Sequence, residues 1–283
     1  MVYRCNEPYN DLPPLPPTHE LESVRVMRRC VTASRALAEL KGAGNLIPNQ
    51  SILINAIPLQ EARLSSEIEN IVTTIYTPPR GRPLILSLLR NLETFLLESS
   101  TLDPLIKMAV AHYQFEAIHP FDDGNGRTGR ILNILVLLQS GLLDIPVLYL
   151  SRYIIQNKIE YYRRLRAVTE AHDWEGWLLY VLAAVEETAR WTTRCITAIR
   201  DLFETTVERC RHEAPKVYSI ELIELIFQQP YCKIAFVVDA GIAKRKTAST
   251  YLQELERIGI LAGERHGRQV IYKHPALLEV LAA

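Results

Sequence analysis

The sequence has no long uncharged apolar run, no paired cysteines and no net charge. No stretch reaches the roughly 18 uncharged apolar residues that predict a membrane helix, and the opening MVYRCNEPYN does not read as a signal peptide. The five cysteines form no CxxC pair, which argues against a disulfide framework or a zinc site. Basic and acidic residues number 32 each, so no general attraction to membranes or nucleic acid is expected. We expect a cytoplasmic protein without a membrane partner.

Helical periodicity covers most of the 283 residues, and strand-like alternation is scarce before residue 260. The pattern predicts a mainly α fold, with a helical bundle over residues 1–212 and a small winged helix-turn-helix domain over 213–283. A proline-rich arm, PYNDLPPLPP, occupies residues 8–17. Such an arm either binds a proline-reading domain or lies along its own domain, and we favour the second.

Residues 119–130, HPFDDGNGRTGR, combine a histidine, two adjacent aspartates, three glycines and two arginines. The apolar segment before them opens with Asp103 and Pro104, which are typical of the N-cap and first position of a helix. The segment after them is apolar on nearly every face up to Ser140. The stretch is therefore predicted to be a turn between two buried helices, with Phe121 anchored in the core.

The composition of this turn is suited to phosphate. Glycines let a ligand approach the backbone closely, and the N–H groups that open the next helix attract anions. Arg127 and Arg130, three positions apart, would share a face and hold further phosphate oxygens. Asp123 is a hard oxygen ligand suited to Mg²⁺, and His119 suits a general base at neutral pH. The predicted ligand is a nucleotide polyphosphate with Mg²⁺. A tight loop around a buried histidine is the alternative, and the joint spacing argues against it.

HPFDDGNGRTGR resembles the signature of Fic-domain proteins, HPFxxGNGRxxR, at every fixed position. The flanking HYQFEAIHPF and LYLSRYIIQNKIEYYRRL are also similar to that family's helices. The resemblance implies an all-α Fic fold that transfers AMP from ATP to a Ser, Thr or Tyr hydroxyl of a protein, itself included. His119 would deprotonate the hydroxyl and Asp123 would hold Mg²⁺. The nucleotide positions that the resemblance implies are Glu69, Asp123, Gly124, Asn125, Gly126, Arg127, Thr128, Gly129, Arg130 and Tyr161. For Tyr161, a core tyrosine at helical spacing is an equal alternative.

A second stretch, SSEIEN at residues 65–70, resembles the family's inhibitory motif, [S/T]xxxE[G/N], on a helix expected over 59–72. Ser65, Glu69 and Asn70 match it, and the upstream EARL is similar to the same region. The Glu69 carboxylate would pair with Arg130 and occupy the guanidinium that the γ-phosphate needs. The family also suggests that this glutamate orients water to remove AMP from a modified protein. The alternative is a solvated helix glutamate.

Between this motif and the next helix, family members usually carry a β-hairpin flap that docks the target. Here IENIVTTIYTPP runs almost directly into RGRPLILSLLRNLETF. A natural deletion and an omission from the sequence both stay open. A natural deletion would put target docking in doubt more than nucleotide binding.

The C-terminal segment 231–274 is locally basic, with eight Lys or Arg against four acids. Within it, AKRKTASTYLQELERIGIL resembles a winged-helix recognition segment. The residues expected to contact DNA are Lys244, Arg245, Lys246, Thr247, Ser249 and, in the wing, Arg268. Dimerisation or target binding by the same module is the alternative.

The first function that these patterns support is a protein adenylyltransferase held off by Glu69, using ATP and Mg²⁺. The second is a DNA-binding regulator whose Fic domain senses nucleotide with little catalysis. A third keeps the fold and transfers another group, such as UMP. A homodimer also stays open.

Overall fold

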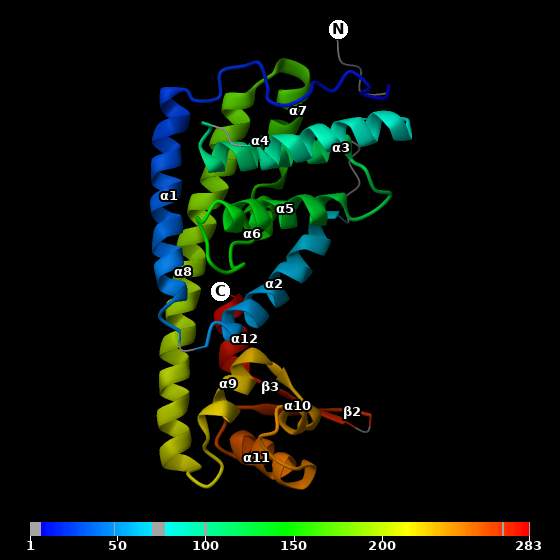
Figure 1. Ribbon diagram of the computed structural model, residues 1–283. Helices are drawn as coiled ribbons and strands as arrows, with labels where there is room; N and C mark the ends of the chain where they lie inside the picture. Colours follow the sequence, from blue (N-terminus) through cyan, green and yellow to red (C-terminus); the bar gives the residue numbers. More distant parts are fainter. Residues whose placement is uncertain (1–6, 48, 70–76, 99–100, 268, 283) are drawn as a thin grey trace. The chain divides into compact units, whose positions relative to one another are not determined.

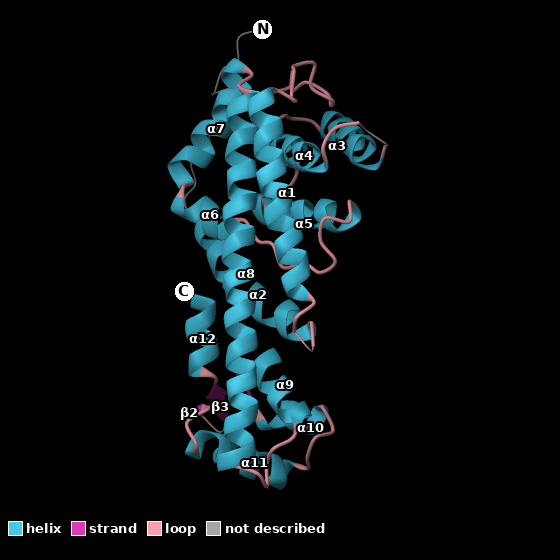
Figure 2. Cartoon of the chain, turned by 90° about the vertical axis from the view of Figure 1, so that its left-hand side faces the viewer, coloured by secondary structure: helices cyan, strands magenta, loops and turns pink. Residues whose placement is uncertain are grey.

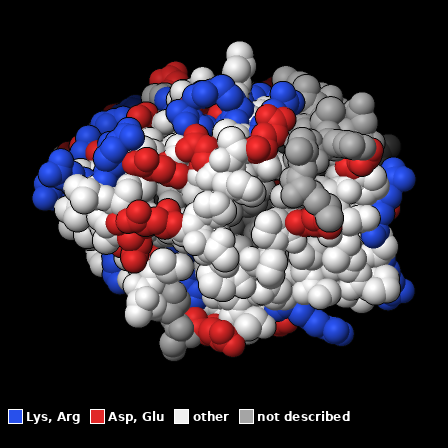
Figure 3. Space-filling model, turned by 90° about the horizontal axis from the view of Figure 1, so that it is seen from above, with Lys and Arg blue, Asp and Glu red and all other residues white. Residues whose placement is uncertain are grey.

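The structure, a computed structural model, describes residues 7–47, 49–69, 77–98, 101–267 and 269–282 (Figure 1). It is mainly helical with one small C-terminal sheet, which confirms the predicted fold class. The chain divides into two compact units, Met1–Lys41 with Glu61–Trp191, and Gly42–Gln60 with Thr192–Ala283. No helix in the described ranges is long and apolar enough to cross a membrane. Acidic and basic side chains are interspersed around a largely uncharged centre on the face drawn in Figure 3.

The first unit is built around one buried helix, α4 (Pro104–Ile118). Asp103 caps it as expected, because its side chain accepts a hydrogen bond of 2.8 Å from the Leu105 N–H. Two neighbours, α3 and α5, pack against it (Figure 1). The other helices that lie wholly or partly in this unit are α1 (Val24–Gly44), α2 (Ser51–Glu69), α3 (Arg82–Leu97), α5 (Asn125–Gln139), α6 (Ser151–Gln156), α7 (Lys158–Ala171) and α8 (Trp174–Glu213).

The helix expected over 59–72 begins earlier, at Ser51, and contains Pro58. The predicted start was wrong because a proline lacks an N–H and clashes with the carbonyl four residues before it, which usually ends a helix. Here an apolar face stabilises the helix through the proline, since Ile52, Leu53 and Ile57 are buried. Asn49 opens the helix by accepting a 3.0 Å hydrogen bond from the Ser51 N–H.

The proline-rich arm lies along its own unit, as expected. Leu12 and Leu15 are buried. Asn91 of α3 forms two hydrogen bonds with the Leu15 backbone, at 2.7 and 2.9 Å, and Gln114 of α4 donates to the Pro13 carbonyl at 2.9 Å. These polar contacts fix the path of a segment whose prolines cannot supply backbone donors.

The second unit contains the sheet (Figure 2). Its antiparallel strands follow the order β1-β3-β2, and the β2–β3 hairpin turns between His266 and Gln269. Gly241, at φ 71°, makes the turn between α10 and α11. This is the order of elements in a winged helix. The elements are α9 (Ile220–Gln228), β1 (Tyr231–Cys232), α10 (Ile234–Asp239), α11 (Arg245–Arg257), β2 (Ala262–His266), β3 (Gln269–Lys273) and α12 (Pro275–Ala282).

Candidate active site

The HPFDDGNGRTGR motif forms the turn between α4 and α5, as the sequence predicts. His119 is exposed and ends α4 in the left-handed conformation, with φ 49° and ψ 60°, and its N–H donates to the Phe115 carbonyl at 3.0 Å. Gly124, also left-handed at φ 83°, is the N-cap of α5. Two left-handed residues thus reverse the chain, and glycine occupies one of them without steric cost. The turn brings His119 and the amino end of α5 into one loop.

Asn125 holds this turn closed from inside α5. Its side-chain oxygen accepts from the Phe121 N–H at 2.9 Å and its amide nitrogen donates to the Phe121 carbonyl at 2.6 Å. Thr128 adds a hydroxyl bond of 2.9 Å to the Gly124 carbonyl. The expectation that the Phe121 ring anchors the turn in the core was wrong, because the residue is 51% exposed. Its backbone is the anchor, held by Asn125.

The amino end of α5 has the features of an anion site. The N–H groups of a helix's first turn have no acceptor within the helix, and they point toward the loop before it. Asp123 lies at this end with its side chain 83% exposed, and its Oδ2 is 3.1 Å from the Arg127 guanidinium. Within the described ranges, no group of three or more His, Cys, Asp or Glu suits a metal ion. A Mg²⁺ here would need Asp123, phosphate oxygens and water, which is the kind of site this ion accepts.

The second arginine, Arg130, lies in different surroundings from Arg127. It is 4% exposed, whereas the Arg127 side chain is 47% exposed. Its Nε lies 3.9 Å from the Glu61 carboxylate of α2, and the Ser151 hydroxyl donates to that carboxylate. Burial raises the Glu61 pKa to about 7, although the Ser151 hydrogen bond and the Arg130 charge act to lower it. Arg127 therefore pairs with an exposed carboxylate, that of Asp123, whereas Arg130 lies beside a largely buried one, that of Glu61.

The inhibitory motif falls at the end of α2. The side chains of Ser65 and Glu69, and all of Asn70, lie outside the described residues. The expected Glu69–Arg130 pairing therefore stays a prediction. Glu61, which sequence reasoning did not single out, is the α2 carboxylate described beside Arg130. The only signal for it was its place in the EARL segment that resembles the family.

The helix contact beneath the turn depends on Gly129. A Cβ at this position would lie 2.7 Å from the Glu116 carboxylate oxygen and 3.3 Å from the Phe115 ring. Glycine thus allows α5 to pack closely on α4. At Gly129, α5 therefore faces α4. The expected contact of Gly129 with nucleotide stays a prediction.

Tyr161 lies in the core, 3% exposed, and its hydroxyl is 2.9 Å from His112 Nε2. Asn133 of α5 contacts the other ring nitrogen of His112 at 3.2 Å, and Trp177 stacks on the imidazole at 5.9 Å. This matches the alternative weighed for Tyr161, a core tyrosine, while its contact with adenosine stays a prediction. Burial, followed by the Arg130 charge, lowers the His112 pKa to about 4, so the imidazole is neutral at physiological pH. In the sequence, the polar residues His112, Gln114 and Glu116 within the otherwise apolar HYQFEAI segment could have indicated buried polar side chains.

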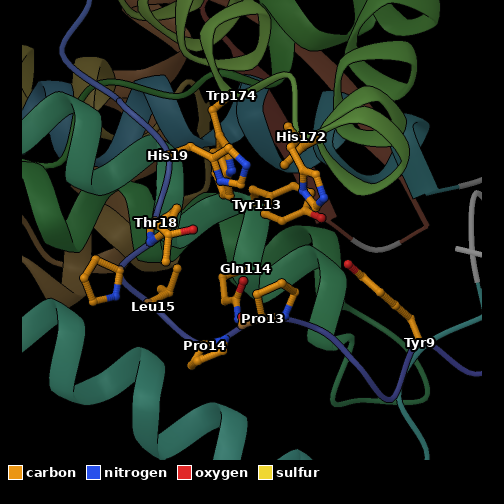
Figure 4. Close-up of a pocket in the computed structure, with 13 residues that line it drawn as sticks. Tyr9, Pro13, Pro14, Leu15, Thr18, His19, Tyr113, Gln114, His172 and Trp174 are labelled. Carbon is orange, nitrogen blue, oxygen red and sulfur yellow. The ribbon is translucent and has the colours of Figure 1, made fainter. Parts of the chain in front are cut away.

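A separate pocket of about 350 Å³ lies between the arm and the helices (Figure 4). Figure 4 shows the rings of His19, Tyr113 and Trp174 gathered at one side, with His172 near them. His19 and His172 stack at 4.8 Å. No motif residue lines this pocket, so it is distinct from the turn at His119.

The basic segment of the C-terminal unit lies at the start of α11. Lys244, Arg245, Lys246 and Thr247 are exposed, and Ser249 is half-buried. Arg268 lies outside the described residues. The helix start thus presents three cations to solvent.

Known Fic/DOC family proteins and protein adenylyltransferases are similar to parts of this chain. Residues 27–77 match the Fic/DOC family N-terminal model, and 202–277 match the C-terminal domain of SoFic-like protein adenylyltransferases. The chain is 30% identical over 157 residues to protein adenylyltransferase fic-1 of Caenorhabditis elegans, covering 54% of this chain and 28% of that protein. It is 39% identical over 79 residues to a probable protein adenylyltransferase of Aquifex aeolicus, covering 28% and 24%.

Each of these matches spans about a quarter of the relative's length. A solved Fic family protein from Desulfovibrio desulfuricans G20 aligns with 91% of this chain and 98% of its own, at 17% identity and a TM-score of 0.42. The Fic/DOC family N-terminal model and the SoFic-like C-terminal model thus match this chain on either side of the HPFDDGNGRTGR turn.

Proposed function

We propose that this protein transfers AMP from ATP to a Ser, Thr or Tyr hydroxyl of a protein. The observation that carries the proposal is the turn from His119 to Arg130, in which an exposed histidine and the amino end of α5 share one loop. The relatives named as protein adenylyltransferases support the reaction type.

In the proposed reaction, His119 accepts the proton of the acceptor hydroxyl. The hydroxyl oxygen of the acceptor forms a bond to the α-phosphorus of ATP. At the same time, the bond between that phosphorus and the oxygen that bridges the α- and β-phosphates breaks. AMP is then esterified to the protein and pyrophosphate leaves. An imidazole with an ordinary pKa near 6.5 suits this role at neutral pH. His119 then returns its proton to water.

The rest of the turn would bind and orient the polyphosphate. The first-turn N–H groups of α5 would donate to phosphate oxygens, and Arg130 would neutralise the outer phosphate. Mg²⁺, when bound, would offset phosphate charge and favour departure of pyrophosphate. Asp123 would hold that ion, which requires its carboxylate to exchange the Arg127 guanidinium, now 3.1 Å away, for the metal. The pair is solvent-exposed, so this exchange is inexpensive.

We further propose that Glu69 holds the enzyme off by pairing with Arg130, and that the same residue takes part in removing AMP. The contact between Arg130 and Glu61 supports this, because Glu61 and Glu69 belong to the same helix. A Glu69 carboxylate on the terminal nitrogens of the Arg130 guanidinium would exclude the γ-phosphate from productive binding.

Labelling with [α-³²P]ATP and Mg²⁺ tests both proposals. We expect Glu69→Gly to raise self-labelling about tenfold or more over wild type, and the Glu69→Gly/His119→Ala double variant to show none. Intact-mass spectrometry should find one added AMP, and an excess of unlabelled UTP should not compete. Labelling that survives the loss of His119 would overturn the transfer mechanism, whereas equal labelling with and without Glu69 would overturn the brake alone.

A second candidate function, DNA binding, is favoured by the three exposed cations at the start of α11, Lys244, Arg245 and Lys246. The start of the second helix is where helix-turn-helix modules contact DNA. At low salt, where phosphate contacts are strongest, wild type should shift a DNA duplex and the triple alanine variant should not. Arg257→Ala, at the other end of α11 and paired with Glu254, is the matched control. No shift by wild type at low salt would reject this function.

A further inference from the structure

We propose that Glu61 is a positioning residue that holds the Arg130 guanidinium in place for the outer phosphate of ATP. The inference deepens the proposed function and rests on it. Glu61 lies about two helical turns before Glu69 on α2, outside the inhibitory motif. We assign it the opposite effect on ATP, since it would support binding where Glu69 opposes it.

The geometry of the contact suits that role. Glu61 Oε1 lies 3.9 Å from Arg130 Nε, and the Ser151 hydroxyl donates to the same carboxylate oxygen. The contact is with the inner nitrogen of the guanidinium. The two terminal nitrogens form the fork that binds phosphate or a carboxylate in a bidentate manner. A partner at Nε therefore orients the fork without occupying it.

Burial explains why Arg130 needs such a partner. The Arg130 side chain is 4% exposed and that of Glu61 is 12% exposed. An arginine stays charged at every physiological pH, and a buried charge without a counter-charge is strongly unfavourable. A nucleotide phosphate supplies a counter-charge only while it is bound. When it is ionised, Glu61 supplies one whether or not a nucleotide is bound, and Ser151, itself fully buried, orients it.

The surroundings of Glu61 also make its charge sensitive to pH. The described groups that act on it are Arg130 of α5, Ser151 of α6 and the neighbouring Tyr149. With a pKa of about 7, Glu61 is mostly ionised at pH 8 and mostly protonated at pH 5.5. Its hold on Arg130 should therefore weaken as the pH falls through neutrality.

The test measures ATP·Mg²⁺ binding by isothermal titration calorimetry, without turnover and without the brake. The parent protein carries His119→Ala and Glu69→Gly. Adding Glu61→Gln, which keeps the shape and the Ser151 hydrogen bond but removes the charge, should weaken the Kd about tenfold at pH 8. Glu61→Asp should restore part of that loss. Ser151→Ala should weaken the Kd about threefold in the same direction, and provides a second measurement if the Glu61 variants do not melt as folded proteins.

Glu186→Gln is the matched control. Glu186 is a buried carboxylate of the same unit that pairs with Arg29 and Arg190 instead of a motif residue. Its loss should leave the Kd within about twofold of the parent value, because general weakening of the fold does not act on Arg130.

The pH dependence separates positioning from a structural role. The ratio of the Glu61→Gln Kd to the parent Kd should fall toward one between pH 8 and pH 5.5, since the parent carboxylate becomes protonated. Titration of ATP itself cancels in this ratio. Equal Kd values at pH 8, a ratio that does not change with pH, or the same loss in Glu186→Gln would overturn the role of Glu61. Absence of any ATP binding by the parent would overturn the proposed function and the inference together.

Discussion

The two faces of α5 use the same residue types for opposite purposes. On the outer face, Arg127 pairs with Asp123 through side chains that are 47% and 83% exposed. On the inner face, Arg130 approaches Glu61 through side chains that are 4% and 12% exposed. Water screens the outer pair, which contributes at most about 1 kcal/mol, while the inner charges depend on each other. An exchangeable pair suits the place where we propose that a nucleotide and a metal ion bind, and a fixed pair suits the framework behind it.

The largest expected effect would break this comparison directly. Arg130→Met should lower the free energy of unfolding by about 3 kcal/mol at pH 8, because it leaves the Glu61 carboxylate buried without its cation. The matched variant Arg127→Met should lower it by less than about 1 kcal/mol. Urea denaturation followed by circular dichroism measures both. At pH 5.5 the Arg130→Met loss should shrink, since Glu61 then takes up a proton. Equal losses in the two variants would show that the faces do not differ.

An effect of similar size concerns the neutral histidine on the inner side. The His112 pKa is about 4 in the folded protein and 6.5 ordinarily. The unfolded chain therefore binds more protons between these values, so stability is fully present above pH 6.5 and is lost as the pH falls toward 4. The loss should reach about 3 kcal/mol.

The measurement is the difference in unfolding free energy between wild type and His112→Gln from pH 7.5 to pH 4. Glu61 titrates with the opposite sign, since its folded pKa of about 7 lies above its ordinary 4.5. It is present in both proteins, so the subtraction removes its contribution. A difference that stays constant with pH would mean that water reaches the imidazole.

The smallest expected effect tests how tightly the inner face is packed. Gly129→Ala should destabilise the protein by about 1 to 2 kcal/mol, because the new Cβ would lie 2.7 Å from the Glu116 carboxylate oxygen. Gly42→Ala, near the end of α1 with nothing within 4 Å of the new Cβ, should instead stabilise it by up to about 1 kcal/mol. Melting temperatures report the signs. A stabilising Gly129→Ala would show that Glu116 moves aside freely.

Features set by local chemistry were predictable from the sequence. The Asp103 cap, the turn before α5 and the glycine between α10 and α11 each follow from a few adjacent residues. The start of α2 was not predictable, because Pro58 usually ends a helix, whereas burial of the apolar face of α2 in the folded protein stabilises the helix through it. The partner of Arg130 was also out of reach, since Glu61 is far away in the chain and only tertiary packing brings the two charges together. Phe121 was mispredicted because its hydrophobic side chain suggested burial. In the structure the Phe121 backbone is held by hydrogen bonds to Asn125, and the ring lies at the surface.

The left-handed backbone at His119 has a consequence for protein engineering. A side chain at φ 49° carries a steric penalty of about 1 kcal/mol that glycine does not. His119→Gly should therefore preserve the turn better than alanine does, and it would remove the imidazole from the loop that leads into α5. Imidazole added to the buffer would then replace the missing base. In such a variant, a small molecule would switch on the proposed AMP transfer and dialysis would switch it off.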